Sequence, residues 1–146
     1  MGTVELNHIA MESSDLKRLA NFYQEVLGFE GVEAPKFTNV EVLWLKLPFN
    51  SSFALHLIQR NPHSKVPVIP YGSGSSSPSS TVADPRALPR RHHLAFSVSN
   101  FDSLVRTLKE KGIETFEKIQ PDGKTRQVFF FDPDGNGLEV QSREAS

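Results

Sequence analysis

Hydrophobic residues recur along the chain with two periods, one typical of strands and one typical of helices. Residues 16–27 carry apolar side chains three and four positions apart, after the capping candidates Ser14 and Asp15 and before Gly28. This pattern predicts an amphipathic helix. A second helix of the same kind is predicted over residues 101–108, with another glycine after it. Strand patterns precede each helix and recur at 40–47, 53–58, 114–119, 126–131 and 138–142.

The two halves of the chain repeat one another with an offset of 85 residues. His8 aligns with His93 and Leu19 with Leu104, and in both halves a strand that carries a histidine leads into the helix. A repeat of this size indicates a duplicated supersecondary unit. The sequence therefore predicts an α+β fold of two β-α-β-β-β modules, at about 3–60 and 91–143, within one domain over residues 1–146.

The segment between the modules, residues 61–90, has a different composition. It holds six of the ten prolines, and residues 72–80 are almost all Gly, Ser and Pro. Such a stretch has too little apolar surface to offset the entropy cost of ordering it. We interpret it as a long connection that is mobile at 72–80, with a lid over a binding site as one hypothesis.

Composition excludes several classes of function. The chain has no cysteine, which rules out disulfides, thiolate metal ligands and a cysteine nucleophile. The net charge is −1 with mixed signs, unlike the basic surface of a nucleic-acid-binding protein, and no apolar run is long enough for a membrane span. The first residues lack the features of a signal peptide, so we expect a cytoplasmic protein without nucleic-acid or membrane partners.

Strand alternation places candidate ligands on one face of each module. His8 and His93 alternate with apolar residues that would face the helix, so each imidazole is expected on the opposite face. In the last strand of each module His56 and Glu139 are likewise flanked by apolar neighbours. Taken singly, such a histidine is more often a hydrogen-bonded core residue and such a glutamate an edge-strand carboxylate. Together, the four predict a divalent metal site, with Zn or Ni favoured and Mn or Fe as alternatives.

Four segments resemble the glyoxalase/bleomycin-resistance/dioxygenase group, also called the vicinal oxygen chelate superfamily. They are NHIAM around His8, FYQEVLGFE at 22–30, HHLAF at 92–96 and, as the most specific, DPDGNGLEV at 132–140. The resemblance implies that paired modules form a cupped, barrel-like mixed sheet with the helices outside, either within one chain or across a homodimer.

In glyoxalase I-like members of that group, the metal ligands come from the first and last strands of each module. The resemblance therefore implies His8, His56, His93 and Glu139 as ligands, with Glu139 also acting as the catalytic base. The subset without His56 is equally similar to the ligand set of fosfomycin-type thiol transferases. The chemistry implied for the group is the binding of two substrate oxygens to the metal and the stabilisation of an oxyanion.

The first hypothesis for function is a glyoxalase I-like lyase acting on a small oxygenated substrate such as a 2-oxoaldehyde adduct. Glu12 and Arg60 occupy positions where the glyoxalase I enzymes bind glutathione with an Arg and an Asn, so they are candidate substrate-binding residues and disfavour glutathione. The alternatives are a non-catalytic protein of the bleomycin-resistance type that binds a small ligand, and a small dioxygenase.

Overall fold

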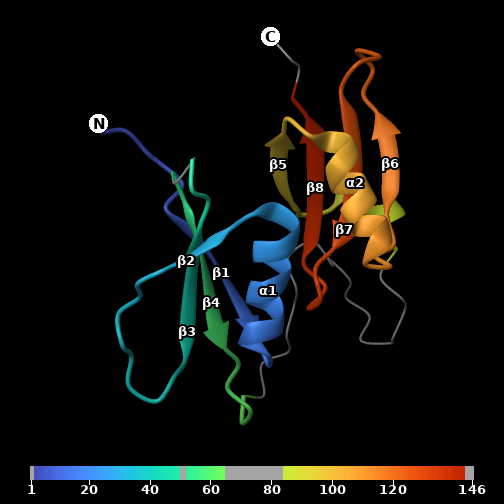
Figure 1. Ribbon diagram of the computed structural model, residues 1–146. Coiled ribbons are helices and arrows are strands. Elements are labelled where there is room, and N and C mark those ends of the chain that lie inside the picture. Colours follow the sequence, from blue (N-terminus) through green and yellow to red (C-terminus); the bar gives the residue numbers. More distant parts are fainter. Residues whose placement is uncertain (1, 50–51, 65–83, 144–146) are drawn as a thin grey trace. The chain divides into compact units, whose positions relative to one another are not determined.

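The computed structural model describes residues 2–49, 52–64 and 84–143, and the chain divides into two compact units (Figure 1). The first unit is Met1–Val68 and the second is Ile69–Ser146. Residues 72–80, for which the sequence predicts mobility, and most of the segment to which the lid hypothesis applies lie outside the described residues.

The first unit is a four-stranded sheet with one helix. Its strands run in the order β1-β4-β3-β2, with β1 parallel to β4 and the other pairs antiparallel. Its elements are β1 (His8–Ser13), α1 (Leu16–Leu27), β2 (Glu30–Val32), β3 (Val42–Lys46) and β4 (Ala54–Gln59).

The second unit repeats this arrangement in the order β5-β8-β7-β6, again with one parallel pair, β5 and β8. Its elements are the 3-10 helix η1 (Pro85–Arg90), β5 (Leu94–Val98), α2 (Phe101–Glu110), β6 (Phe116–Ile119), β7 (Arg126–Phe131) and β8 (Gly137–Ser142). The predicted α+β class with two β-α-β-β-β modules is confirmed. The described strands form two separate sheets rather than one closed barrel.

Capping fixes the ends of α1 as the sequence predicts. The carboxylate of Asp15 accepts a hydrogen bond from the backbone N–H of Arg18 at 3.1 Å. At the other end, Gly28 adopts φ 75°, a left-handed conformation that a residue without a Cβ adopts readily. None of the helices in the described part of the chain is long and apolar enough to cross a lipid bilayer.

Each helix covers one face of its own sheet, and the hydrophobic core of each unit lies between that helix and that sheet. Tyr23 of α1 is fully buried, and its hydroxyl lies 3.7 Å from the sulfur of Met11 on β1. Leu55 and Leu57 of β4 are also fully buried. The equivalent core positions of the second unit are Leu108, Val128, Phe130, Leu138 and Val140, all fully buried. On β1, β4, β7 and β8 the positions that alternate with these core residues therefore face away from the helix.

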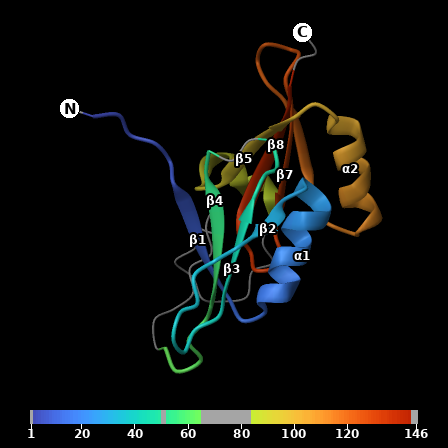
Figure 2. The ribbon, with the colours of Figure 1, turned by 60° about the vertical axis from the view of Figure 1, so that its left-hand side comes forward.

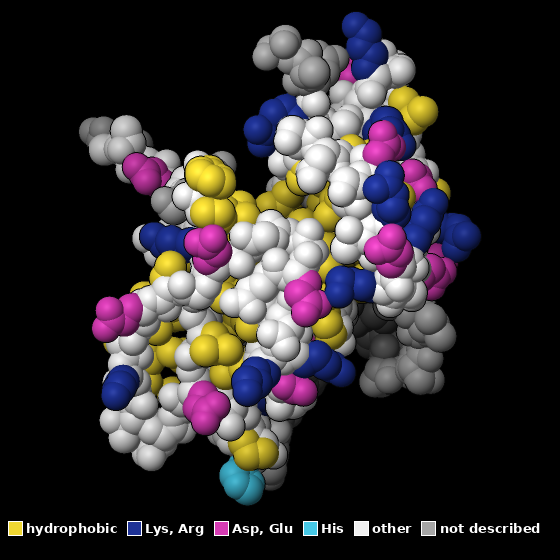
Figure 3. Space-filling view, viewed as in Figure 1, with side chains coloured by type: hydrophobic (Ala, Val, Ile, Leu, Met, Phe, Trp, Pro, Cys, Tyr) yellow, Lys and Arg dark blue, Asp and Glu magenta, His cyan; other side chains and the backbone are white. Residues whose placement is uncertain are grey.

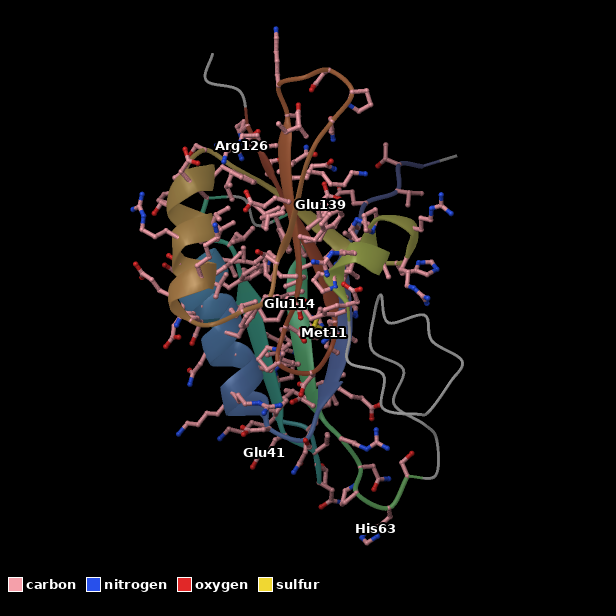
Figure 4. The ribbon with its side chains drawn as sticks, turned by 90° about the vertical axis from the view of Figure 1, so that its right-hand side faces the viewer. Met11, Glu41, His63, Glu114, Arg126 and Glu139 are labelled. Carbon is pink, nitrogen blue, oxygen red and sulfur yellow. The ribbon has the colours of Figure 1, made fainter. Side chains whose placement is uncertain are left out.

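The helix η1 lies within the range 61–90, for which the sequence predicts only a connection. It packs against β7 and β8, on the side of the sheet opposite α2 (Figures 2 and 4). Leu88, in the middle of η1, is fully buried. The last residues of the predicted connection therefore form part of the second unit and cover some of the face that carries the candidate ligands.

Candidate functional site

The strand register shows that His56 and Glu139 occupy equivalent positions in the two sheets. His56 pairs with Ala10 on one side and with Trp44 on the other. Glu139 pairs with Ala95 and Phe129 in the same way. In each unit, therefore, the last-strand candidate lies between a small residue, two positions after the first-strand histidine, and an aromatic residue.

Three rings form a continuous stack on the open face of the first unit. The imidazoles of His8 and His56 stack with 4.0 Å between centroids and an interplanar angle of 14°. On its other side His56 stacks on the indole of Trp44 at 3.9 Å and 3°. The two histidines predicted as ligands in this unit are thus in direct contact, with their rings facing away from α1.

His8 is oriented by the residue before it. Its Nδ1 lies 2.6 Å from Oδ1 of Asn7. A carbonyl oxygen can only accept a hydrogen bond, so Nδ1 carries the proton and donates it. In the neutral ring, Nε2 then has a free lone pair, which is the form in which histidine binds a metal.

In the second unit, His93 and Glu139 are in contact. Nε2 of His93 lies 2.9 Å from Oε1 of Glu139, and both side chains are largely shielded, with 16% and 9% exposed. Nδ1 of His93 lies 2.7 Å from the backbone oxygen of Arg91 and must donate to it. Glu139 lies within β8 (Figure 4).

The other oxygen of Glu139 is also occupied. Nε2 of Gln127 on β7 donates to Oε2 at 2.9 Å. The ring of Phe129 meets His93 edge to face, with 5.6 Å between centroids. Both oxygens of the carboxylate therefore have a partner: Oε2 is fixed by Gln127, and Oε1, which faces His93, is the candidate for chemistry.

The contact between His93 and Glu139 requires a cation. With the His93 proton on Nδ1, the neutral ring and an ionised Glu139 point lone pairs at each other across 2.9 Å. Either a proton or a metal ion must lie between them. Ligand atoms on one tetrahedral zinc ion, with bonds of about 2.1 Å, lie about 3.4 Å apart, so the 2.9 Å contact has the length of a hydrogen bond and would open by about 0.5 Å to admit a metal.

Each unit brings its own two predicted ligands together. In the described part of the chain, no group of three or more His, Asp or Glu side chains is close enough to hold a metal ion. His8 and His56 form one pair in the first unit, and His93 and Glu139 form another in the second. That the two pairs share one ion remains a prediction.

A buried turn sets the position of Glu139. Asp132, which is 4% exposed, accepts hydrogen bonds from the backbone N–H groups of Asp134 and Asn136 and from the amide of Asn136. Gly135 completes the turn with φ 87°. The DPDGNG segment, residues 132–137, therefore joins β7 to β8 and ends two residues before Glu139.

The two candidate substrate-binding residues lie on or just beyond the same sheet as His8. Glu12 is exposed and alternates with the buried Met11, so it shares a face with His8. The backbone N–H of Arg60, directly after β4, donates to the oxygen of Ser13 at 2.9 Å. His63, to which the sequence gives no role, lies on an exposed loop (Figure 4).

Burial is the main cause of a lowered pKa at His56, and the nearby His8 and Lys46 lower it further. All three effects disfavour the protonated ring. The neutral imidazole is the form that a metal requires. The environment of His56 therefore favours ligand chemistry over a charged histidine.

A hollow lies on the α1 side of the first unit, between α1, the loop over residues 33–41 and β3 (Figure 3). Trp44 lines it together with Leu43 and Phe37, and neither His8 nor His56 does.

Sequence reasoning missed Trp44 and Gln127. Both precede buried apolar residues on their strands, and alternation alone could have assigned them to the ligand face. Their contacts, however, depend on cross-strand register, which the sequence does not reveal.

Similar proteins place the chain in a family with several activities. YwkD of Bacillus subtilis is 34% identical over 92% of this chain and 94% of its own length. A lactoylglutathione lyase of Schizosaccharomyces pombe is 30% identical over 98% of the chain, which spans 49% of that enzyme. The human mitochondrial methylmalonyl-CoA epimerase is 26% identical over 96% of the chain and 73% of its own length.

Solved structures share the fold at low sequence identity. A protein from Bacillus anthracis described as a glyoxalase family member matches with a TM-score of 0.68 and 19% identity over 99% of this chain and 98% of its own. TnmS3, an antibiotic-binding protein from Streptomyces, matches with a TM-score of 0.65 and 19% identity over 99% of both chains. The family model of the Glyoxalase/Bleomycin resistance protein/Dioxygenase superfamily matches residues 5–140, and the chain belongs to that superfamily.

Proposed function

We propose that the protein is a metal-dependent enzyme of the glyoxalase I type, acting on a small oxygenated substrate such as a 2-oxoaldehyde adduct. The observation that carries the proposal is the contact of His93 with Glu139 at 2.9 Å, in which Nε2 of His93 faces a shielded carboxylate and each partner is oriented by a further hydrogen bond. His8 and His56 are the other candidate pair, and at least one ring would turn out of the parallel stack for both to bind one ion. We propose that the two pairs hold one divalent ion, with Zn or Ni favoured.

A divalent ion at these residues would polarise two oxygens of the substrate and make the neighbouring C–H bond more acidic. Glu139 accepts the proton from that carbon and returns it to the adjacent carbon, so the net reaction is an isomerisation that needs no oxidant. Gln127 keeps one oxygen of Glu139 occupied. Proton transfer would therefore use Oε1, the oxygen that faces His93, after that oxygen leaves the proposed ion.

The names of the relatives support a type of reaction, proton transfer at a carbon beside a carbonyl, and do not point to a single substrate. A lactoylglutathione lyase and several methylmalonyl-CoA epimerases match the chain. An epimerase that inverts a carbon beside a carbonyl also begins by removing a proton from it, and then delivers a proton to the opposite face of the same carbon. Epimerisation of an acyl thioester is therefore the second candidate, with Glu139 as one of the two proton-transfer groups that inversion requires.

The alternative to an enzyme is a non-catalytic protein that binds a small ligand. TnmS3 shows that this fold binds an antibiotic, at an identity that supports the fold alone. The set of four candidate ligands supports the enzyme over the binding protein, whereas the burial of Glu139 favours neither, because both of its oxygens already have partners in His93 and Gln127. A small dioxygenase would need Fe(II) on two histidines and one carboxylate, which the four candidates could also provide.

The test begins with elemental analysis of the purified chain, followed by assays with each metal restored. We expect one divalent ion per chain and isomerisation of a 2-oxoaldehyde adduct. Glu12 on the ligand face should repel the carboxylates of glutathione, so an adduct with an uncharged thiol should react faster. Metal-free protein that stays inactive with Zn, Ni, Mn and Fe on both adducts and on an acyl thioester contradicts the proposal.

Variants of Glu139 separate catalysis from folding. Glu139→Gln should lower the rate of isomerisation by about 10²–10⁴-fold, the range for loss of a general base, while the fold is retained. Gln141→Leu, on the same strand and face, is the matched control and should leave the rate unchanged. A homodimer and a cytoplasmic location remain predictions, and light scattering tests the first.

A further inference from the structure

The strand register of the second unit arranges the side chains opposite α2 in two neighbouring rows across the sheet. One row consists of Ala95, Glu139, Phe129 and Phe116, and the next consists of Ser97, Gln141, Gln127 and Lys118. The first row carries the proposed base, and the second has polar side chains only. In one direction along the strands, therefore, the face beside Glu139 is polar.

Lys118 lies at the outer end of the polar row, on the edge strand β6. Glu117, the residue before it, points to the opposite side, because its carboxylate lies 3.7 Å from Nζ of Lys109 on α2. Strand alternation therefore places Lys118 on the same face as Glu139. The side chain is exposed, and within the described ranges it makes no hydrogen bond or ion pair. Its ammonium group is thus available to a ligand on this face.

The helix η1 lies toward the other end of this face. The backbone oxygen of Arg91, directly after η1, accepts the hydrogen bond from His93 just before β5. A guanidinium nitrogen of Arg86, within η1, lies 3.9 Å from a carboxylate oxygen of Glu114, just before β6. Both strands run in the same direction, and Lys118 lies near the end of β6. Within the second unit, a substrate at the proposed base can therefore extend toward Lys118 and away from η1.

The first unit shows that the fold does not require this polar row. The strand β3 has Val42 where β7 has Gln127. The strand β2 ends at Val32, the equivalent of Phe116, so no residue of β2 corresponds to Lys118. The polar row is a property of the unit that carries the proposed base and not of the shared fold.

We propose that Lys118 is a specificity-determining residue that binds an anionic group of the substrate while Glu139 transfers the proton. The inference rests on the proposed function and narrows its substrate class. Neighbouring strands about 4.8 Å apart and a rise of about 3.3 Å per residue put the Cα atoms of the two residues about 12 Å apart. Contacts of about 3 Å at each end leave about 6 Å for the substrate, the length of roughly four carbon–carbon bonds. The substrate is therefore a carbonyl compound with a carboxylate at about that distance from the carbon that loses its proton.

The activity test uses adducts of 2-mercaptoethanol, an uncharged thiol, with 4,5-dioxopentanoate and with its methyl ester. The two adducts have the same chain and differ in charge. We expect a KM about 10-fold lower for the acid, the effect of one charge-assisted hydrogen bond. The kcat should be similar for both, because the carboxylate is remote from the reacting carbon.

Substitutions assign that preference to one side chain. Lys118→Met should raise the KM of the acid about 10-fold and leave the ester unchanged, whereas Lys118→Arg should keep the preference. Lys109→Met, which removes one positive charge on the α2 side of the sheet, is the matched control. A lysine that only protects the sheet edge from pairing with another chain would not distinguish the acid from the ester.

A binding measurement needs neither metal nor turnover. 4-Oxopentanoate, which has the same carbonyl and carboxylate but no aldehyde, is titrated into the full-length chain and followed by NMR of the backbone amides. Lys118→Met should weaken its binding about 10-fold, and its methyl ester should bind the unaltered chain as weakly as the acid binds the variant.

The outcomes separate the two proposals. If 4-oxopentanoate binds through Lys118 and no metal gives isomerisation of either adduct, the proposed function fails and the anion site stands without it. If the unaltered chain isomerises both adducts with the same KM, the proposed function stands and the role of Lys118 is wrong. That role is also wrong if 4-oxopentanoate does not bind, or binds folded Lys118→Met and the unaltered chain equally tightly.

Discussion

Nε2 of His93 and Oε1 of Glu139, 46 residues apart in the chain, lie 2.9 Å apart on the face of the second sheet that α2 leaves uncovered. The proton on Nδ1 of His93 is committed to the backbone oxygen of Arg91. This pair therefore needs a proton or a metal ion between its two atoms, and the chemistry proposed for the protein depends on which of them is present.

Gln127 should control how Glu139 binds a metal. Its amide donates to Oε2 at 2.9 Å, so Gln127→Leu frees that oxygen and loosens the carboxylate. We expect metal affinity to fall by about 10–100-fold, as for other groups that orient ligands. Calorimetry with Zn²⁺ measures the change. Gln141→Leu, whose native amide bonds to Ser97, serves as the control, and equal losses in the two variants would argue against a specific role for Gln127.

Asp132 should be important for stability rather than for chemistry. Its buried carboxylate accepts three hydrogen bonds within the turn before β8. Asp132→Ala leaves those donors without an acceptor and should lower the free energy of unfolding by about 2–4 kcal/mol. Asp132→Asn keeps two of the three hydrogen bonds, so its free energy of unfolding should lie between those of the unaltered chain and of Asp132→Ala. Urea denaturation gives these values, and an unchanged midpoint for Asp132→Ala would show that the turn forms without its carboxylate.

Leu88 tests whether η1 belongs to the second unit. Its side chain is fully buried, so Leu88→Ala creates a cavity and should cost about 2–4 kcal/mol of unfolding free energy. Ala87→Gly, at the exposed neighbouring position, controls for effects on the short helix itself. A cost for Leu88→Ala that is no larger than that of the control would mean that η1 contributes little to the core.

The pKa of His56 should respond to its neighbours in the metal-free protein. Burial, His8 and Lys46 lower this pKa from its ordinary value of 6.5. Lys46→Ala should therefore raise it, which an NMR titration of the imidazole protons detects. Lys118→Ala on β6, in the second unit, is the control.

The same shift predicts how stability depends on pH. Because the pKa of His56 is lower in the folded chain than in the unfolded chain, the unfolded chain takes up the proton more readily below pH 6.5. The contribution of His56 is therefore present above pH 6.5 and is lost as the pH falls below it. Part of the drop in the urea midpoint between pH 7.5 and pH 5.5 should vanish in His56→Gln. An equal drop in both proteins would contradict the assigned shift.

Much of the fold follows from local sequence signals. Asp15 and Gly28 delimit α1 as predicted, and the predicted strand at 126–131 has the observed bounds of β7. The short strand β2 (Glu30–Val32) received no predicted range, because its three residues are all exposed and give no alternation. The sequence did not predict the helix η1, because it lies in a proline-rich segment without helical periodicity. The packing of Leu88 in the core accounts for its order.

The candidate site was predictable only in part. Alternation assigned His56 and Glu139 to the face opposite the helix, and the register pairs them with Trp44 and Phe129; their role as metal ligands stays a prediction. The contacts of Trp44 and Gln127 depend on which residues lie opposite one another across the strands, and a shift by one residue would reverse every face. Whether the two ligand pairs meet depends on how the modules pair, which no local pattern encodes.

The number of metal ions bound by paired variants tests the central claim most directly. Two double variants are compared with the unaltered chain by elemental analysis after dialysis against Zn²⁺ or Ni²⁺: His8→Ala with His56→Ala, and His93→Ala with Glu139→Ala. A shared centre predicts one ion in the unaltered chain and none held tightly in either double variant. An ion retained by either double variant, or none in the unaltered chain, would contradict a single centre built from both modules.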